Sequence, residues 1–469
     1  MSRVVILRVV LVVLLGAALL PMPATEAAAP RRGAQAVVAI VDSGINPYHV
    51  TFRDNSPLAK KHPSTYIPGY PKDAIALELS FDEPDYWKAV KRDCERVWSK
   101  IESGKLYWFP GTKIVGGITF EETGELDCAP VEPEAIGRIL DSNGHGTMTA
   151  SRATSTEYGA CPACRVVSVQ FSANAFTRQD AIDSIGWAAE NADWIDAQSN
   201  SWGPLAPAWE PTGQSQMFTA NPEIVRKVEE VSQAHLAFWA SGNGAAFRGG
   251  ALGHPTLLSP HLGPSAIIVG GHDSGYVNTW PGFPPHLAAD SCSSWAAYSN
   301  EIEKSEENVG GGTSAATPFV AGGAVRILFE ARSLLKDGST GVDGKVVARG
   351  KARGITKGPL SDGKLTLQEW KRLLYTTATP RPKGQHGDGP PCGPIDTPYN
   401  ATPIKWTDVP EGYPEYLHIG YGAIDSDSMK LALDVLRGAK EMPTRAQTDQ
   451  YFEQDAAARA ALYEVWSKP

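Results

Sequence analysis

The chain has 469 residues, of which 42% are hydrophobic and 20% are charged. These proportions predict a folded protein with a large core and argue against a disordered one. The formal net charge of −9 at pH 7 argues against nucleic acid as a partner, because proteins that bind nucleic acid usually carry a basic excess.

Residues 1–29 have the pattern of a secretory signal peptide. Arg3 and Arg8 supply positive charge, Val9–Leu20 is apolar, and Pro21–Ala29 ends in small residues. The alternative is an uncleaved membrane anchor, which needs roughly 20 apolar residues, and Arg8 interrupts this stretch. We therefore expect a secreted, extracellular protein without stable membrane insertion once the signal has been cleaved.

Short apolar runs alternate with helical patterns through the middle of the chain. Buried strands are predicted at residues 36–41, 165–171, 236–240 and 266–269, and helices at 179–190 and 221–233. This order predicts an α/β fold in which helices cover both faces of a mostly parallel sheet. Active residues are then expected at the carboxyl ends of the strands.

The segment from about Tyr48 to Phe109 interrupts this alternation. It is rich in Pro, Tyr, Trp and charge, with one helical pattern near Tyr86–Ile101, and we interpret it as an insertion. A Gly- and Lys-rich stretch, residues 336–359, is predicted to be an exposed loop. We expect one main domain over residues 30–440 and a C-terminal helical extension over 441–469. Closing helices are predicted at Ser426–Leu436 and Ala446–Trp466.

Six cysteines form an even set, which in an exported chain favours disulfide bonds. The run Cys161–Cys164 (Cys-Pro-Ala-Cys) is compatible with a redox pair or with half of a zinc site. No second motif of this kind completes a tetrahedral site, so we expect a local bridge. Six cysteines allow many pairings. Pairing of Cys94 with Cys128 and of Cys292 with Cys392 is the assignment left by elimination.

Three polar residues lie where this pattern places active residues. Asp42 ends the first predicted strand before a Ser-Gly turn, His145 begins a helical pattern after a capping turn at Asp141, and Ser314 begins another after Gly-Thr. A serine hydroxyl is a weak nucleophile at neutral pH, and it needs a base and a third group that orients the base. Each residue alone is weak evidence, but together they supply all three parts.

The runs Val38–Gly44, Asn143–Thr147 and Gly312–Gly323 together resemble the motifs of the subtilisin-like serine proteases, the subtilase or peptidase S8 family. The order Asp, His, Ser is the order of that family. The resemblance extends from about Ala36 to Leu436, and it implies the family's three-layer α/β fold. It also implies the roles of nucleophile, general base and orienting carboxylate for Ser314, His145 and Asp42.

Two further segments match motifs of the family. The run Ala240–Gly244 matches the oxyanion-binding segment, which implies that Asn243 stabilises the oxyanion. Taken alone, an asparagine between two glycines is typical of a turn. The run Asn-Ser-Trp-Gly-Pro that begins at Asn200 matches the strand that pairs with an extended substrate. In this resemblance the substrate-binding residues are Ser201, Trp202 and Gly203.

The resemblance implies a secreted, monomeric endopeptidase that hydrolyses polypeptide substrates through an acyl-enzyme and requires no cofactor. Structural calcium is frequent in the family, but no ligand cluster in the sequence is specific enough to assign, so no metal-binding residue is named. Few residues separate the predicted signal cleavage from Asp42. We therefore expect no N-terminal prodomain of the kind that subtilisin-like enzymes commonly carry.

Three alternatives stay open. An aspartic protease needs two Asp-Ser/Thr-Gly turns, and Asp42 has a candidate mate in Asp273, but that pairing leaves the other candidates unexplained. A sedolisin-type acid peptidase shares the Gly-Thr-Ser turn, but it uses carboxylates where this chain has His145 and Asn243. A catalytically altered protein of the same fold, either a peptide ligase or acyltransferase or an inactive binding scaffold, is the third.

Overall fold

The structure is a computed structural model, which describes residues 35–121, 126, 128, 137–171, 178–202, 222–241, 263–273, 276–278, 285–290, 295–307, 311–339, 345–380 and 419–468. All of these residues belong to one compact unit, Arg31–Pro469. The predicted signal segment lies outside the described residues.

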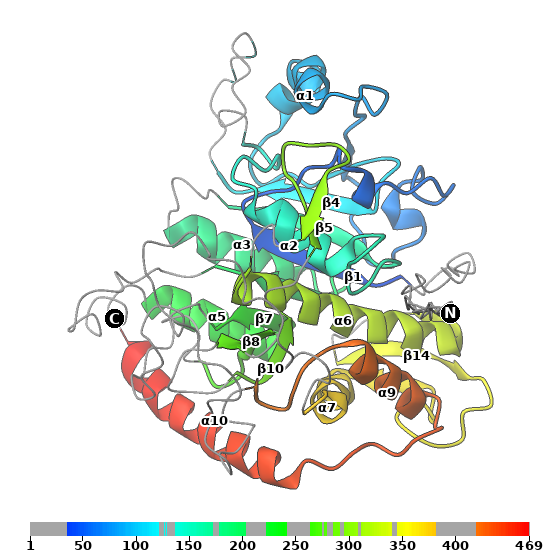
Figure 1. Ribbon diagram of the computed structural model, residues 1–469, viewed down its shortest axis with the longest axis vertical. Coiled ribbons are helices and arrows are strands. Elements are labelled where there is room, and N and C mark those ends of the chain that lie inside the picture. The colour runs from blue at the N-terminus through cyan, green and yellow to red at the C-terminus, as the bar shows by residue number, and fades with distance from the viewer. Residues whose placement is uncertain are drawn as a thin grey trace, which may run out of the picture. The chain divides into compact units, whose positions relative to one another are not determined.

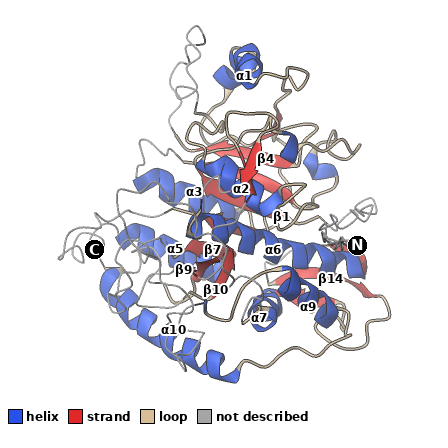
Figure 2. Ribbon diagram, viewed as in Figure 1, coloured by secondary structure: helices blue, strands red, loops and turns tan. Residues whose placement is uncertain are grey.

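The centre of this unit is a sheet of ten strands in the described part of the chain (Figure 1; Figure 2). Its order is β10 (Leu287–Asp290), β8 (Ile267–Asp273), β7 (Leu236–Ala240), β6 (Ala197–Asn200), β1 (Val37–Asp42), β5 (Arg165–Gln170), β4 (Ile114–Thr119), β3 (Tyr107–Trp108) and β2 (Ile75–Ala76), and β9 (Tyr276–Asn278) pairs with β8. The described pairs are parallel except β3 with β4 and β8 with β9. Strand β1 lies between β5 and β6, with Val38 opposite Val166 and Ala197.

Helices cover both faces of the sheet. Alternate residues of β1 enter two separate cores, because successive side chains of a strand point to opposite faces. One core contains α2 (His145–Thr154) and α6 (Thr313–Leu334), and the other contains α3 (Arg178–Glu190) and α5 (Pro222–Ala234). This arrangement confirms the predicted three-layer α/β fold with a mostly parallel sheet.

The remaining described elements surround this centre. They are α1 (Tyr86–Cys94), α7 (Leu367–Thr377), α9 (Ser426–Leu436), α10 (Ala446–Trp466), the short 3₁₀ helices η1 (Val50–Phe52), η2 (Pro63–Thr65) and η3 (Trp98–Lys100), and the hairpin of β11 (Trp295–Ala297) and β12 (Ser305–Glu307). Helices α9 and α10 have the predicted bounds. Helix α1 is shorter than predicted and is followed by η3.

The predicted loop at residues 336–359 is wrong in part. Strands β13 (Leu335–Ser339), β14 (Val346–Ala352) and β15 (Lys364–Thr366) form a small antiparallel sheet. Leu335, Ala348 and Leu365 are buried within it. Few apolar side chains in this stretch reach the core, so the alternation that signals a strand is weak in the sequence.

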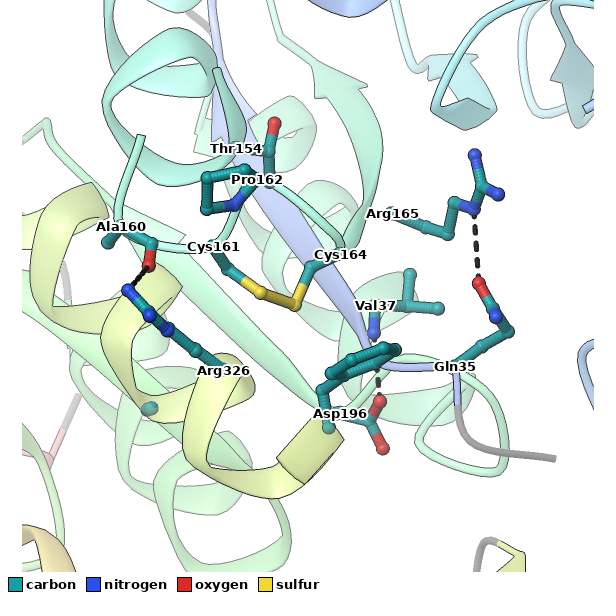
Figure 3. The surroundings of a disulfide bond; sticks show 12 residues. Gln35, Val37, Thr154, Ala160, Cys161, Pro162, Cys164, Arg165, Asp196 and Arg326 are labelled. Atoms are coloured by element: carbon teal, nitrogen blue, oxygen red, sulfur yellow. Dashed lines mark hydrogen bonds between the residues drawn. A yellow bond between two sulfur atoms is a disulfide. The ribbon is translucent and has the colours of Figure 1, made fainter. Parts of the chain in front are cut away.

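Two of the predicted disulfide bonds are present, Cys94–Cys128 and Cys161–Cys164. Figure 3 shows the second bond, with Arg326 of α6 donating to the carbonyl oxygen of Ala160 at 3.4 Å. Cys292 and Cys392 lie outside the described residues.

The described helices include none that is both long and apolar enough to cross a membrane.

Candidate active site

The carboxylate of Asp42 and the imidazole of His145 are in direct contact. Nδ1 of His145 lies 2.8 Å from Oδ1 of Asp42 and 3.0 Å from Oδ2. Asp42 is buried, and its carboxylate also accepts hydrogen bonds from the backbone N–H of Ser43 at 2.8 Å and from Oγ1 of Thr149 at 3.3 Å. A proton on Nδ1 is therefore held by the carboxylate, which leaves Nε2 of a neutral ring as the basic nitrogen.

The pKa of His145 is raised above 6.5 by its surroundings. Burial opposes protonation, but the negative charge of Asp42, the hydrogen bond to Asp42 and the charge of Asp141 together outweigh it. The side chain of His145 is 34% exposed, so part of the ring is open to solvent. A base with a raised pKa that is accessible from solvent suits proton transfer near neutral pH.

Two glycines allow the end of β1 and the start of α2 to approach this closely. A Cβ atom on Gly146 would lie 2.1 Å from the carbonyl oxygen of Gly44. Gly44 has φ +120°, a conformation that favours glycine, and a Cβ atom there would lie 2.6 Å from the carbonyl oxygen of Ile139. The glycines that follow Asp42 and His145 in the sequence are therefore needed for contact between the two side chains.

Asp141 joins the same two segments by hydrogen bonds. Its buried carboxylate accepts from the backbone N–H groups of Asn143, Gly144 and Thr147 at 3.1, 2.8 and 2.7 Å, which caps the start of α2. It also accepts from Oγ of Ser43 at 2.9 Å, and the same Oγ accepts from the N–H of Gly146 at 2.8 Å. Sequence reasoning identified the cap at Asp141, but it missed the link to Ser43.

Ser314 is the second residue of α6, which begins after Gly312 in a positive-φ conformation (φ 71°). Its Oγ donates a hydrogen bond to the carbonyl oxygen of Ser201 at 3.2 Å, and Oγ of Ser201 donates to the carbonyl oxygen of Ser314 at 3.0 Å. Within the described residues, no hydrogen bond joins Ser314 to His145 in this state. The hydroxyl of Ser314 is therefore held by the backbone at the end of β6.

The three predicted residues nevertheless gather at one edge of the sheet. Ser201 directly follows β6, so its reciprocal hydrogen bonds hold the start of α6 at the carboxyl end of that strand. Asp42 ends the neighbouring strand β1 and holds the start of α2. Helices α2 and α6 pack tightly, because a Cβ atom on Gly322 would lie 2.5 Å from the carbonyl oxygen of Ala153.

The other predicted site residues are described only in part. Ser201 is buried, and the ring of Trp202 packs edge-on against Phe171 with centroids 4.9 Å apart. Gly203 and Asn243 lie outside the described residues. Strand β7, which leads toward Asn243, ends beside β6 at the same edge of the sheet.

The described residues can also be compared with two other kinds of site, a pair of catalytic aspartates and a metal centre. Asp273 ends β8, and strands β6 and β7 separate β8 from β1, so Asp273 and Asp42 lie on strands about 14 Å apart at the usual strand spacing. Two carboxylates that share a proton must be far closer than this. The described His, Cys, Asp and Glu residues include no cluster suited to hold a metal ion.

A cleft of about 930 Å³ lies elsewhere, between the insertion and the β11–β12 hairpin. Val50, Arg53, Phe81 and Glu303 are among its lining residues, and none of the predicted site residues is among them. It is therefore not the candidate active site.

The model of the subtilase family matches residues 33–381. The chain belongs to the subtilase family, which confirms the recognition made from its motifs. No curated protein matches the chain.

Three solved structures illustrate the likeness. A cold-adapted subtilisin-like serine proteinase is 17% identical, with 80% of this chain and 88% of that chain covered and a TM-score of 0.39. The patellamide maturation protease PatA is 17% identical, with 87% and 98% covered and a TM-score of 0.42. The epidermin leader peptide processing serine protease (EpiP) from Staphylococcus aureus is 14% identical, with 86% and 76% covered and a TM-score of 0.42. None of these values is high enough to transfer a substrate or a residue's role.

The family and the fold support a serine-protease-type function in general terms.

Proposed function

We propose that the chain is a secreted serine endopeptidase that hydrolyses peptide bonds through an acyl-enzyme, with Asp42, His145 and Ser314 as its triad. The observation that carries this proposal is the 2.8 Å contact between Nδ1 of His145 and Oδ1 of Asp42. It gives His145 the tautomer that a general base needs, at the start of a helix that packs against α6, the helix that contains Ser314 in its first turn.

In the first half of the reaction, Oγ of Ser314 attacks the carbonyl carbon of the peptide bond. Nε2 of His145 takes the hydroxyl proton and then gives it to the leaving amine, and Asp42 stabilises the imidazolium that forms. In the second half, a water molecule attacks the acyl-ester and His145 takes its proton. The bond to Oγ then breaks, His145 gives the proton to Oγ, and the carboxylic acid product leaves with Ser314 restored. The negative oxygen that develops in each half needs donors, and Asn243 and the backbone N–H of Ser314 are the groups we assign to it.

The substrate is proposed to bind as an extended strand along Ser201, Trp202 and Gly203. Ser201 directly follows β6, and its carbonyl oxygen now accepts the hydroxyl of Ser314. A substrate N–H that bonds to this carbonyl in place of the hydroxyl would release Ser314 for its contact with His145. Strand addition gives affinity through the main chain, so it supports polypeptides as a substrate class without fixing one sequence.

The proposal extends to the location, oligomeric state and cofactor needs of the enzyme. The two disulfide bonds and the signal-like segment support export to an oxidising compartment. We propose a monomer that needs no cofactor, because the triad supplies the base, the nucleophile and the orienting charge from one chain. No calcium ligand is assigned.

The proposal is tested with a casein-like substrate and a serine-directed fluorophosphonate label. Purified protein is expected to cleave and to label, and Ser314→Ala is expected to do neither while remaining folded. Ser333→Ala is the matched control, since Ser333 lies in the same helix and its Oγ donates to the carbonyl oxygen of Phe329 one turn earlier. A folded wild-type chain that neither cleaves nor labels would instead identify an inactive scaffold. Products joined to an added amine, in place of hydrolysed products, would identify a ligase or acyltransferase.

A further inference from the structure

Arg138 and Ile139 adopt a backbone conformation that is unfavourable for their residue types. Their φ angles are 53° and 80°, and among the described residues they are the non-glycine residues with positive φ. A β-branched residue such as isoleucine rarely adopts this conformation. It persists where the surrounding structure holds the backbone in place, which occurs most often at functional sites.

This left-handed pair directly precedes the segment that positions His145. The carbonyl oxygen of Ile139 accepts from the N–H of Ile45 at 2.8 Å, and it lies 2.6 Å from the position of a Cβ atom on Gly44. Two residues later, Asp141 caps the helix that begins at His145. The pair therefore sets the distance between the end of β1 and the start of α2.

The buried side chain of Gln170, in β5 of the sheet, forms hydrogen bonds that fix the backbone of this pair. Oε1 of Gln170 accepts from the N–H of Ile139, and Nε2 donates to the carbonyl oxygens of Ser43 at 3.1 Å and Leu140 at 3.4 Å. Gln170 ends β5 opposite Asp42 in the register of the sheet. A single amide thus connects the residue after Asp42 with the loop before His145.

The insertion holds the pair from the other side. Nη1 of the buried Arg138 donates to the carbonyl oxygens of Trp98 at 3.2 Å and Ser99 at 2.9 Å, both in η3. Trp98 is itself fixed, because its Nε1 donates to the hydroxyl of Tyr48 at 3.1 Å and that hydroxyl donates to the buried carboxylate of Asp93 at 2.8 Å. The carbonyl groups that Arg138 contacts therefore belong to a firmly packed part of the insertion.

The side chain of Ile139 and a disulfide bond strengthen the same connection. Cγ2 of Ile139 lies 2.7 Å from the position of a Cβ atom on Gly117 in β4, so the side chain fits only over a glycine. The Cys94–Cys128 bond ties the end of α1 to Cys128, which precedes Arg138 by ten residues in the sequence. The insertion therefore makes specific hydrogen bonds to residues 138–144, the loop before His145, which we call the histidine loop. A segment that only enlarged the surface would not need such contacts.

We infer that Arg138 is a positioning residue for His145, through which the insertion braces the loop that sets the contact between His145 and Asp42. The inference rests on the proposed function, in which His145 is the general base. It assigns the insertion a role in the rate of reaction and none in substrate affinity. Ser201 follows β6, and β6 lies on the opposite side of β1 from the insertion strands β2 and β3.

The test compares Arg138→Gln with Arg53→Gln in the full-length protein. Arg53 is a matched control, because it also lies in the insertion and donates to a backbone carbonyl oxygen, that of Tyr48, yet it does not contact the histidine loop. The readouts are kcat and KM on a peptide substrate, the thermal unfolding midpoint, and the pKa of His145 followed by NMR of the histidine ring. The His145 signal is assigned by its loss in His145→Gln.

We expect R138Q to lower kcat about 10- to 100-fold with KM unchanged, since small displacements of a catalytic group have effects of this size. The pKa of His145 is expected to move toward 6.5, because Asp42 and Asp141, the charged groups that raise it, act less strongly on a displaced ring. R53Q is expected to change neither quantity. A folded R138Q with the kcat and His145 pKa of the wild type would overturn the inference, and so would an equal loss of kcat in R53Q.

Two outcomes need a second variant or a second measurement: an unfolded R138Q and an inactive wild type. If R138Q does not fold, R138K takes its place under the same outcomes, because it keeps the charge but loses the rigid guanidinium whose Nη1 bonds to both carbonyl oxygens. If the wild type proves inactive, the proposed function fails, while the His145 pKa in R138Q still reports whether Arg138 positions the ring. If the wild type is active and R138Q behaves like it, only the brace fails.

Discussion

Nδ1 of His145 lies 2.8 Å from Oδ1 of Asp42, although the two residues are 103 positions apart in the sequence. This contact depends on the packing of Gly44 against Gly146 and on the shared hydrogen bonds of Ser43 and Asp141. It supplies both the tautomer and the raised pKa that the proposed mechanism requires of its base.

The substitution Asp42→Asn is expected to lower kcat about 10⁴-fold, the size typical for loss of the orienting carboxylate. The amide NH₂ of an asparagine at this position donates to Nδ1 of His145. The ring proton then sits on Nε2, so Nε2 is unable to act as a base. Steady-state kinetics on a peptide substrate measure the effect, and circular dichroism checks that the variant is folded. An Asp42→Asn enzyme with more than a tenth of wild-type kcat would contradict the assigned role.

The pH dependence of kcat/KM is expected to show an acidic limb with a pKa above 6.5. His145 must be neutral to accept the proton of Ser314, and Asp42 and Asp141 raise the pKa of its ring, so activity falls as the pH drops through that raised value. The same shift makes the charged form of His145 stabilising below pH 6.5 and removes that stabilisation as the pH rises through the raised pKa. Activity that peaks below about pH 4 and survives His145→Ala would show carboxylate chemistry instead.

Gly146→Ala is expected to abolish activity and to cost about 1–3 kcal/mol of unfolding free energy, because the new methyl group would overlap the carbonyl oxygen of Gly44. Gly186→Ala is the control, since the nearest atom to its new methyl group is the flexible end of Lys227 at 3.4 Å. That change, in the middle of α3, is expected to stabilise by about 0.5–1 kcal/mol. Urea denaturation and kinetics measure both, and an active Gly146→Ala would be inconsistent with the packing described.

His286 is expected to make the fold sensitive to acid. Its buried ring stacks on Phe452 of α10 with centroids 4.9 Å apart, and burial, with help from the positive charges of Arg459 and Lys371, lowers its pKa well below 6.5. Below pH 6.5 the unfolded chain therefore binds a proton that the folded chain does not, and stability falls by up to about 1.4 kcal/mol per pH unit.

His286→Phe removes this titration and keeps the stacked ring. The difference in unfolding free energy between pH 7 and pH 5, measured by urea denaturation, is expected to be smaller in the variant than in the wild type. Equal differences in the two proteins would show that His286 is not protonated on unfolding in this range.

The sequence predicts the candidate site well where the signals are local. A strand that ends at Asp42, a helix that begins at His145 and a helix with Ser314 in its first turn can be recognised from short runs of residues. The structure bears out each of these elements.

The supporting contacts could not be predicted, because their partners come from distant segments. Gln170 meets Ile139 from another strand, and Arg138 meets the carbonyl groups of Trp98 and Ser99 across the insertion. The sequence of Arg138 and Ile139 also gives no turn signal, since neither residue favours positive φ. Only the assembled fold shows why the backbone adopts that conformation.

The central claim is that Ser314 is the nucleophile, and the most direct measurement maps the residue that reacts with a fluorophosphonate. Peptide mass spectrometry of the labelled wild-type protein is expected to find the adduct on Ser314. Labelling is expected to be lost in Ser314→Ala and greatly slowed in His145→Ala, because the hydroxyl then lacks its base. An adduct on a different residue, or cleavage of casein that persists in Ser314→Ala, would contradict the account.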